Sequence, residues 1–209
     1  MKLSYKKGKG DKVHLHADGD YILTVDELFF STLSIKQNQE VSADELNKIS
    51  DLICERRAYN YALSLLSRRD HTAKELKAKL SQKGFQRYCE KVVEKLISQD
   101  FVNDERFAEH FVRELVNLKG YGKRRVEQEL FRKGVEKEII SNVLDETEFE
   151  DEKLLGIIER KYLRHLDTEK GVRKTVNSLI RLGYSYSEIR DAIKTVLENN
   201  EFNFEVTDE

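Results

Sequence analysis

Three glycines recur at nearly constant spacing along the chain, and each follows a run of helix-forming residues. Gly84, Gly134 and Gly183 lie 50 and 49 residues apart. An apolar residue follows each glycine and a leucine precedes it by four residues, a pattern typical of a helix that ends in a left-handed glycine. The leucines are Leu80, Leu130 and Leu179. A period of this length is typical of stacked helical repeats, and it constrains the fold more than any other feature.

Amphipathic patterns flank each glycine-terminated helix and predict three helices per repeat. We expect one helix before it, at residues 59–67, 105–118 and 153–165, and one after it, at residues 88–98, 137–146 and 186–198. A unit of about 48 residues buries little surface alone, so the repeats should stack on one another. We therefore predict a mainly α fold, with three tandem three-helix repeats forming an elongated, curved array.

Helix starts are marked by hydroxyl side chains, and the chain contains no proline. Ser42, Thr72 and Ser185 are each followed three residues later by a glutamate, which is the sequence of a capping box. Because glycines end the helices and hydroxyls begin them, the connections need no rigid turn. We expect soft joints that let such an array adjust its curvature.

The first 41 residues predict a β-hairpin and a short helix. Residues 12–16 alternate in side-chain direction, residues 21–25 are β-branched or aromatic, and Asp18-Gly19 between them favours a tight hairpin turn. Asp26 should cap a short helix over residues 27–33. A two-stranded hairpin is marginal alone, so it should dock on the helices or pair with another molecule.

These patterns divide the chain into five segments. We expect a hairpin and short helix at 1–41, a first repeat with a lead-in helix at 42–103, a second repeat at 104–150, a third at 151–198 and an acidic tail at 199–209. The acidic run 145–152 joins the second and third repeats. It is either a flexible hinge or a solvated connector in which Asp151 caps the next helix.

Composition and residue placement exclude several classes of protein. Charged residues make up 36% of the chain, no apolar stretch approaches 18 residues and the N-terminus lacks a signal-peptide pattern, so we expect a cytoplasmic protein without a membrane span. Cys54 and Cys89 lack zinc-ligand spacing and suit a reducing compartment. His14 and His16 share a strand face but have no third metal ligand nearby. No nucleophile lies beside the other histidines, so we expect no enzymatic activity, cofactor or metal.

Charge is unevenly distributed, although the formal net charge is only −2. Residues 56–137 carry 20 basic and 12 acidic side chains, a net charge of +8, whereas residues 1–55 and 138–209 carry −3 and −7. A basic middle favours an anionic partner, because a local field steers association. Solvated helix faces would explain the same distribution equally well.

The densest basic feature is the segment Lys119–Arg125, in which two glycines flank Tyr121 and three consecutive cations begin a helix. Cations there oppose the helix dipole, so we expect a compensating ligand: a phosphate held by the side chains and free amides of the first turn, or carboxylates of a partner protein. Tolerated surface charge is the remaining alternative. Basic residues recur at equivalent regions of the other repeats. The candidate partner- or DNA-binding residues are Arg68, Arg69, Lys74, Lys77, Lys119, Tyr121, Lys123, Arg124, Arg125, Arg132, Lys133, Arg173 and Lys174.

A set of motifs in this order resembles the RecX regulators of bacterial recombination. The set comprises Thr72-x-x-Glu75-Leu76, Lys83-Gly84-Phe85, Asn103-Asp104 through Phe107-Ala108, Lys119-Gly-Tyr-Gly122 with Arg124, and Glu129-Leu130 with Lys133-Gly134-Val135. The resemblance is strongest over residues 57–144 and weaker over the third repeat. The N-terminal hairpin is similar to an extension found in some members.

The resemblance implies tandem three-helix repeats and a cytoplasmic regulator that is not an enzyme. Members of the family bind the RecA recombinase, chiefly its filament on DNA, and limit filament growth, ATP hydrolysis, strand exchange and coprotease activity in recombination and the SOS response. We therefore expect a monomer that binds the RecA filament, with single- or double-stranded DNA as a further candidate partner. The alternative is an autonomous nucleic-acid-binding protein that uses Lys119 to Arg125.

Overall fold

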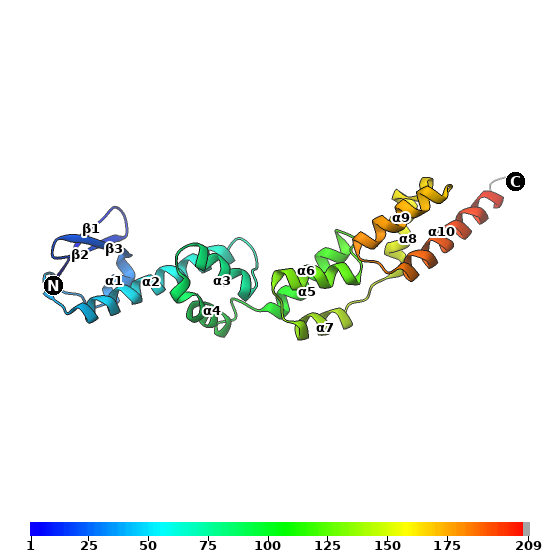
Figure 1. Ribbon diagram of the computed structural model, residues 1–209. Helices are drawn as coiled ribbons and strands as arrows, with labels where there is room; N and C mark the ends of the chain where they lie inside the picture. Colours follow the sequence, from blue (N-terminus) through cyan, green and yellow to red (C-terminus); the bar gives the residue numbers. More distant parts are fainter. Residues whose placement is uncertain (207–209) are drawn as a thin grey trace. The chain divides into compact units, whose positions relative to one another are not determined.

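The computed structural model describes residues 1–206, with side chains described through residue 200. This part of the protein is mainly helical and carries a small antiparallel sheet near the N-terminus, which confirms the predicted fold class (Figure 1). The chain divides into two compact units. The first contains residues 1–71 and 76–102, and the second contains residues 72–75 and the chain from Asn103 onward.

A four-stranded antiparallel sheet begins the first unit. Its strands are β1 (Lys2–Lys7), β2 (Lys12–Ala17), β3 (Asp20–Asp26) and β4 (Gln39–Glu40), in the order β3-β2-β1-β4. The predicted hairpin is the β2–β3 pair, and its turn residues Asp18 and Gly19 have positive φ angles of 51° and 95°. β1 and β4 were not expected from the sequence, because β1 fully buries only Leu3 and β4 is two residues long.

Two helices complete the N-terminal part, α1 (Glu27–Thr32) and α2 (Ala43–Leu66). Asp26 caps α1 as predicted, because its carboxylate accepts a hydrogen bond from the Phe29 amide at 2.8 Å. The 24 residues of α2 form one continuous helix, so the lead-in helix and the helix expected at 59–67 are a single element.

The sheet docks on α2, which confirms the first of the two expectations for the hairpin. Side chains of β1, β2 and β3 share a core with Ile53 of α2, and Figure 1 shows the sheet lying over this helix. The buried members of the core are Leu3, Val13, Leu15, Leu23, Val25, Ile35, Val41 and Ile53.

Every repeat helix expected from the amphipathic pattern is present. The first repeat contains the end of α2, α3 (Ala73–Gln82), η1 (Gln86–Tyr88) and α4 (Cys89–Ser98); the second contains α5 (Asp104–Asn117), α6 (Lys123–Lys133) and α7 (Lys137–Asp145); the third contains α8 (Asp151–Lys161), η2 (Leu163–His165), α9 (Glu169–Leu182) and α10 (Tyr186–Val206). No helix within the described residues is both long and apolar enough to cross a membrane.

The predicted end of the last helix at residue 198 is wrong, because α10 continues to Val206. No glycine or proline interrupts residues 186–206, so nothing in the local sequence stops the helix there. The expected loose tail at 199–209 is thus helical as far as Val206, and its last three residues lie outside the described part.

The three repeat glycines end their helices in the predicted left-handed conformation. The φ angles of Gly84, Gly134 and Gly183 are 91°, 84° and 99°. In each repeat, the amide of the residue after the glycine donates a hydrogen bond to the carbonyl of the leucine that lies four residues before the glycine. This is the Schellman arrangement. These distances are 2.9 Å for Phe85 to Leu80, 3.2 Å for Val135 to Leu130 and 3.2 Å for Tyr184 to Leu179. All three leucines are fully buried.

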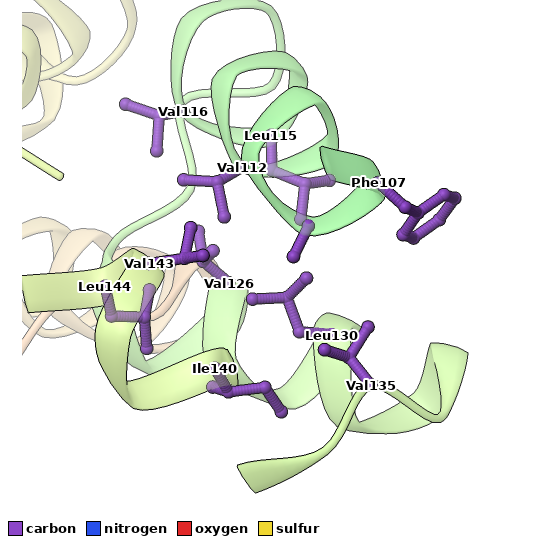
Figure 2. Close-up of a cluster of buried hydrophobic side chains, with 11 residues drawn as sticks. Phe107, Val112, Leu115, Val116, Val126, Leu130, Val135, Ile140, Val143 and Leu144 are labelled. Atoms are coloured by element: carbon purple, nitrogen blue, oxygen red, sulfur yellow. The ribbon is translucent and has the colours of Figure 1, made fainter. Parts of the chain in front are cut away.

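The second and third repeats each enclose an apolar core. In the second repeat, Val112 and Leu115 of α5 point toward Val126 and Leu130 of α6, and α7 closes the cluster (Figure 2). The third repeat encloses an equivalent core between α8, α9 and α10 around the buried Leu179. Each set of three short helices therefore buries its apolar stripes against one another.

Candidate partner-binding surface

The basic segment Lys119–Arg125 forms a joint with the third repeat. The Gly122 amide donates a hydrogen bond to the Leu182 carbonyl at 2.9 Å, and the Arg124 amide donates to the Gly183 carbonyl at 3.3 Å. The C-terminus of α9 thus occupies the N-terminus of α6. The expectation that free first-turn amides hold a phosphate here is wrong, because backbone carbonyls of the same chain already accept from this turn.

Close approach of two backbones explains the glycine at this joint. A Cβ atom on Gly122 would lie 2.8 Å from the carbonyl carbon and oxygen of Gly183, which is closer than real Cβ atoms approach other atoms. Tyr184 adds a hydrogen bond from its hydroxyl to the Gly120 carbonyl at 3.2 Å. The positive end of the α6 dipole therefore meets the negative end of α9, which offsets part of the unfavourable interaction with the cations that begin α6.

An equivalent joint connects the first turn of α3 to the end of α6, both in the second unit. The buried Thr72 hydroxyl donates a hydrogen bond to the Lys133 carbonyl at 2.7 Å, and the Lys133 ammonium pairs with Glu75 at 2.8 Å. Thr72 and Gly122 both lie twelve residues before their repeat glycine. That spacing was available in the sequence and is the signal that could have revealed the joints.

Three exposed cations remain at the α6 joint, and we name them the α6 cation cluster: Lys119, Lys123 and Arg124. Lys119 lies 3.3 Å from Glu114, and Lys123 lies 3.5 Å from Asp145. The Arg124 side chain has no partner within the described part of the chain. Exposed ion pairs of this kind contribute about 0–1 kcal/mol each, so a binding partner can replace them at low cost.

Arg125 and Tyr121 contact each other and are less exposed than the side chains of the α6 cation cluster. The half-buried Arg125 pairs with Glu129 at 2.7 Å, and its guanidinium carbon lies 5.6 Å from the centre of the Tyr121 ring. Arg132 also pairs with Glu129, at 3.2 Å. These contacts stabilise α6 itself, so the α6 cation cluster is the better candidate for contact with a partner.

The other predicted cations lie at separate places. Lys133 pairs with Glu75 and lies over the Phe111 ring at 5.5 Å, while exposed Lys74 covers Gly134 with its aliphatic stem. Arg173 pairs with Glu169 at 3.3 Å, and Lys174 is exposed on the same helix, α9.

The candidates of the first unit follow α2 or lie on α3. Arg68 is exposed, and Arg69 donates to the Asp70 carbonyl at 2.7 Å. Lys77 pairs with Glu90, and this hydrogen bond raises the pKa of the ammonium above its usual value.

An open groove beside the α6 cation cluster was not expected from the sequence. It has a volume of about 640 Å³ and lies between α6 and α7. Lys123 and Asp145 line its rim, while Ile140, Leu144 and the 59% exposed Phe131 supply apolar surface. An exposed phenylalanine within a helical repeat resembles a core residue in the sequence pattern, so only the structure distinguishes it. Two lysines, Lys123 and Lys137, and two acids, Glu127 and Asp145, line the groove, so it suits a partner that combines an apolar side chain with polar groups of either sign.

Comparison with known proteins identifies the repeats. The chain matches the family model of the first three-helix domain of RecX over residues 58–96 and that of the second three-helix domain over residues 103–144. A crystal structure of a regulatory protein RecX matches 91% of this chain and 97% of its own, with a TM-score of 0.66 at 22% identity. The RecX structure from Lactobacillus salivarius gives a TM-score of 0.62 at 28% identity, over 68% of this chain and 96% of its own.

Curated relatives match along nearly the whole chain. Regulatory protein RecX of Clostridioides difficile is 29% identical over 206 residues, which cover 97% of either chain. Regulatory protein RecX of Caldanaerobacter subterraneus subsp. tengcongensis is 33% identical over 189 residues, which cover 90% of this chain and 95% of the relative. Because the likeness extends over the helical repeats and the N-terminal sheet alike, this chain belongs to the RecX family of regulatory proteins.

Proposed function

We propose that this protein is a cytoplasmic regulator of homologous recombination that binds the RecA filament on single-stranded DNA. It limits filament growth, and with it ATP hydrolysis, strand exchange and coprotease activity. The observation that carries the proposal is the α6 cation cluster, which a backbone joint holds on the surface beside a groove of mixed polar and apolar lining. Membership of the RecX family of regulatory proteins supports RecA as the partner.

The side chains of the cluster, rather than the backbone of α6, make the contact. The amides of Gly122 and Arg124 already donate within the chain, so they offer no phosphate-binding nest. Lys123 and Arg124 are exposed, and their charges remain available to carboxylates or phosphates on a filament. The acidic third repeat contacts basic surface elsewhere on the same filament.

The direct test follows ATP hydrolysis by RecA on single-stranded DNA while the protein is added. The wild-type chain should slow hydrolysis, and Lys123→Glu/Arg124→Glu should need about tenfold more protein for the same effect, because two attractive charges become repulsive. Arg125 is left unchanged because it stabilises α6.

A matched control reverses two exposed cations of α10, as Arg190→Glu/Lys194→Glu. This variant should retain full potency, which separates the α6 cation cluster from a general effect of charge. Hydrolysis that continues unchanged at severalfold excess of wild-type protein over RecA would overturn the proposed function. Equal potency of the wild type and the cluster variant would overturn the assignment of the site.

A further inference from the structure

A second pocket lies in the third repeat, between η2 and the first half of α9. It has a volume of about 530 Å³. Its lining residues are Tyr162, His165, Thr168, Lys170, Gly171, Lys174, Thr175 and Ser178. Within the described part of the chain, no acidic side chain lines this pocket. Two lysines, a histidine and four hydroxyl-bearing residues therefore line one space, a composition that suits an anion. The Ser178 hydroxyl already donates to the Lys174 carbonyl at 2.9 Å, so it does not count among the donors for a ligand.

Thr175 is the residue that most needs an explanation. It lies eight residues before its repeat glycine, where the other repeats place the fully buried Leu76 and Val126. Thr175 is only 1% exposed, and its hydroxyl oxygen has no hydrogen-bond partner within the described residues. A buried polar group without a partner is destabilising, and valine of the same shape would avoid this cost. A hydroxyl at this position is explained if a ligand in the pocket accepts its hydrogen bond.

The local backbone also shapes this pocket. A Cβ atom on Gly171 would collide with the His165 carbonyl oxygen, so glycine allows η2 to lie directly against α9. The Gly171 amide donates to the Thr168 hydroxyl at 3.1 Å. Glu169, the acid nearest in sequence, pairs with Arg173 instead of lining the pocket. Lys170 and Lys174 lie four residues apart, so they occupy one side of α9 at successive turns.

We propose that this pocket binds a phosphate group, held by the Lys170 and Lys174 ammonium groups and by the Thr175 hydroxyl. The inference goes beyond the proposed function, because it assigns a ligand chemistry to the third repeat and does not require RecA. A phosphodiester of a nucleic acid strand and a free phosphate compound share this chemistry. Both present oxygen acceptors that suit ammonium and hydroxyl donors.

The test titrates the isotope-labelled full-length chain, first with inorganic phosphate and then with an oligothymidylate of twelve nucleotides, at constant ionic strength. Saturable shifts of the Gly171, Lys174 and Thr175 amide signals are the expected result. Lys170→Glu/Lys174→Glu should abolish them, whereas the control Arg190→Glu/Lys194→Glu should bind as the wild type does. Saturation by both ligands assigns the pocket to a strand phosphate, and saturation by inorganic phosphate alone assigns it to a free phosphate compound.

Thr175→Val keeps the shape of the side chain and tests the pocket rather than surface charge. It should weaken phosphate binding by about tenfold, because a hydrogen bond to a charged acceptor is lost. It should also raise the melting temperature of the unliganded protein, which shows that the variant folds. Wild-type affinity in Thr175→Val would overturn the proposal, and so would shifts that never saturate with either ligand.

Discussion

Gly183 and Gly84 adopt the same left-handed conformation in different surroundings. Comparing them separates the cost of the left-handed backbone from the cost of a steric collision when a side chain is added. A Cβ atom on Gly84 would meet nothing within 4 Å, whereas one on Gly183 would collide with the backbone of Arg125. Gly84→Ala should therefore cost about 1–2 kcal/mol of unfolding free energy, from the left-handed conformation alone. Gly183→Ala should cost at least about 3 kcal/mol, because the joint between α9 and α6 must also open.

Hydrogen exchange of the helix amides measures the two costs separately, since the glycines belong to different units. The amides of α3 report on Gly84→Ala, and those of α6 and α9 report on Gly183→Ala. Equal losses in the two variants would contradict the close approach at the joint.

Tyr88 in the first unit should ionise later than an ordinary tyrosine. Burial, followed by the hydrogen bond that its hydroxyl donates to Asp51 at 2.7 Å, raises the pKa of Tyr88 from 10.0 to about 12. The folded state thus favours the neutral phenol. The resulting stabilisation is complete below about pH 10 and is lost as the pH rises through about 12.

Absorbance at 295 nm during alkaline titration should resolve this late ionisation among the nine tyrosines of the chain. Tyr88→Phe should remove the late step and leave the earlier ones in place. If the curves of the two proteins differ only near pH 10, the environment described for Tyr88 is incorrect.

At the scale of the element, the repeat helices were predictable because their signals are local. The C-terminal glycine and its preceding leucine determine where a helix ends, and these residues act within one turn. Strand β4 was missed because it has two residues and pairs with the distant β1, and β1 was missed because its sequence lacks a clear apolar alternation, although its partner β2 follows it directly in the chain. The continuity of α2 was missed because the helix extends under the sheet, and its residues bury different faces along its length.

The candidate site was predictable only in part, for a related reason. The recurrence of basic residues identified the segment Lys119–Arg125, because charge is visible in the sequence. The chain partners of its amides were not visible, since Leu182 and Gly183 lie some 60 residues away. From the sequence, a glycine followed by cations at a helix N-terminus indicates a phosphate-binding site. The structure shows that the C-terminal carbonyls of α9 accept from the amides of this helix N-terminus instead.

The Thr72 hydroxyl joins two elements, and its removal should loosen both. It accepts a hydrogen bond from the Glu75 amide at 3.1 Å and donates one to the Lys133 carbonyl at 2.7 Å. Thr72→Val should lower the unfolding free energy of the second unit by about 2 kcal/mol, since a helix cap and a buried hydrogen bond are both lost. Thr72→Ser keeps the hydroxyl and should lose less, mainly from the missing methyl group.

Exchange of the Glu75 amide is the specific readout for Thr72. It should become faster in Thr72→Val and remain close to wild type in Thr72→Ser. An effect of the same size in both variants would show that packing of the methyl group, rather than the hydroxyl, holds α3 to α6.

At the scale of the whole molecule, opposite charges are segregated along the chain while the total nearly cancels. The segment 56–137 carries a net charge of +8, and the segment 138–209 carries −7. Several basic side chains of the segment 56–137 are paired locally in exposed pairs, which reduce the local field without removing it. With such a distribution, the rate of association with a charged partner depends on the charge of the segment that faces the partner, and not on the net charge of the chain.

The field of the basic segment should therefore appear in the rate of association with the RecA filament. Between about 50 and 200 mM salt the screening length shortens from well above to below about 10 Å, so the wild-type association rate should fall steeply. Lys123→Glu/Arg124→Glu should associate about tenfold more slowly at low salt and depend less on salt, while its dissociation rate changes little. Arg190→Glu/Lys194→Glu should retain the wild-type salt dependence, because it alters a segment that is already acidic. Stopped-flow measurement of the association rates of the three proteins tests this prediction. If the three rates depend on salt in the same way, the basic segment does not steer binding. The α6 cation cluster would then differ from the rest of the surface only in the contacts that it makes after encounter.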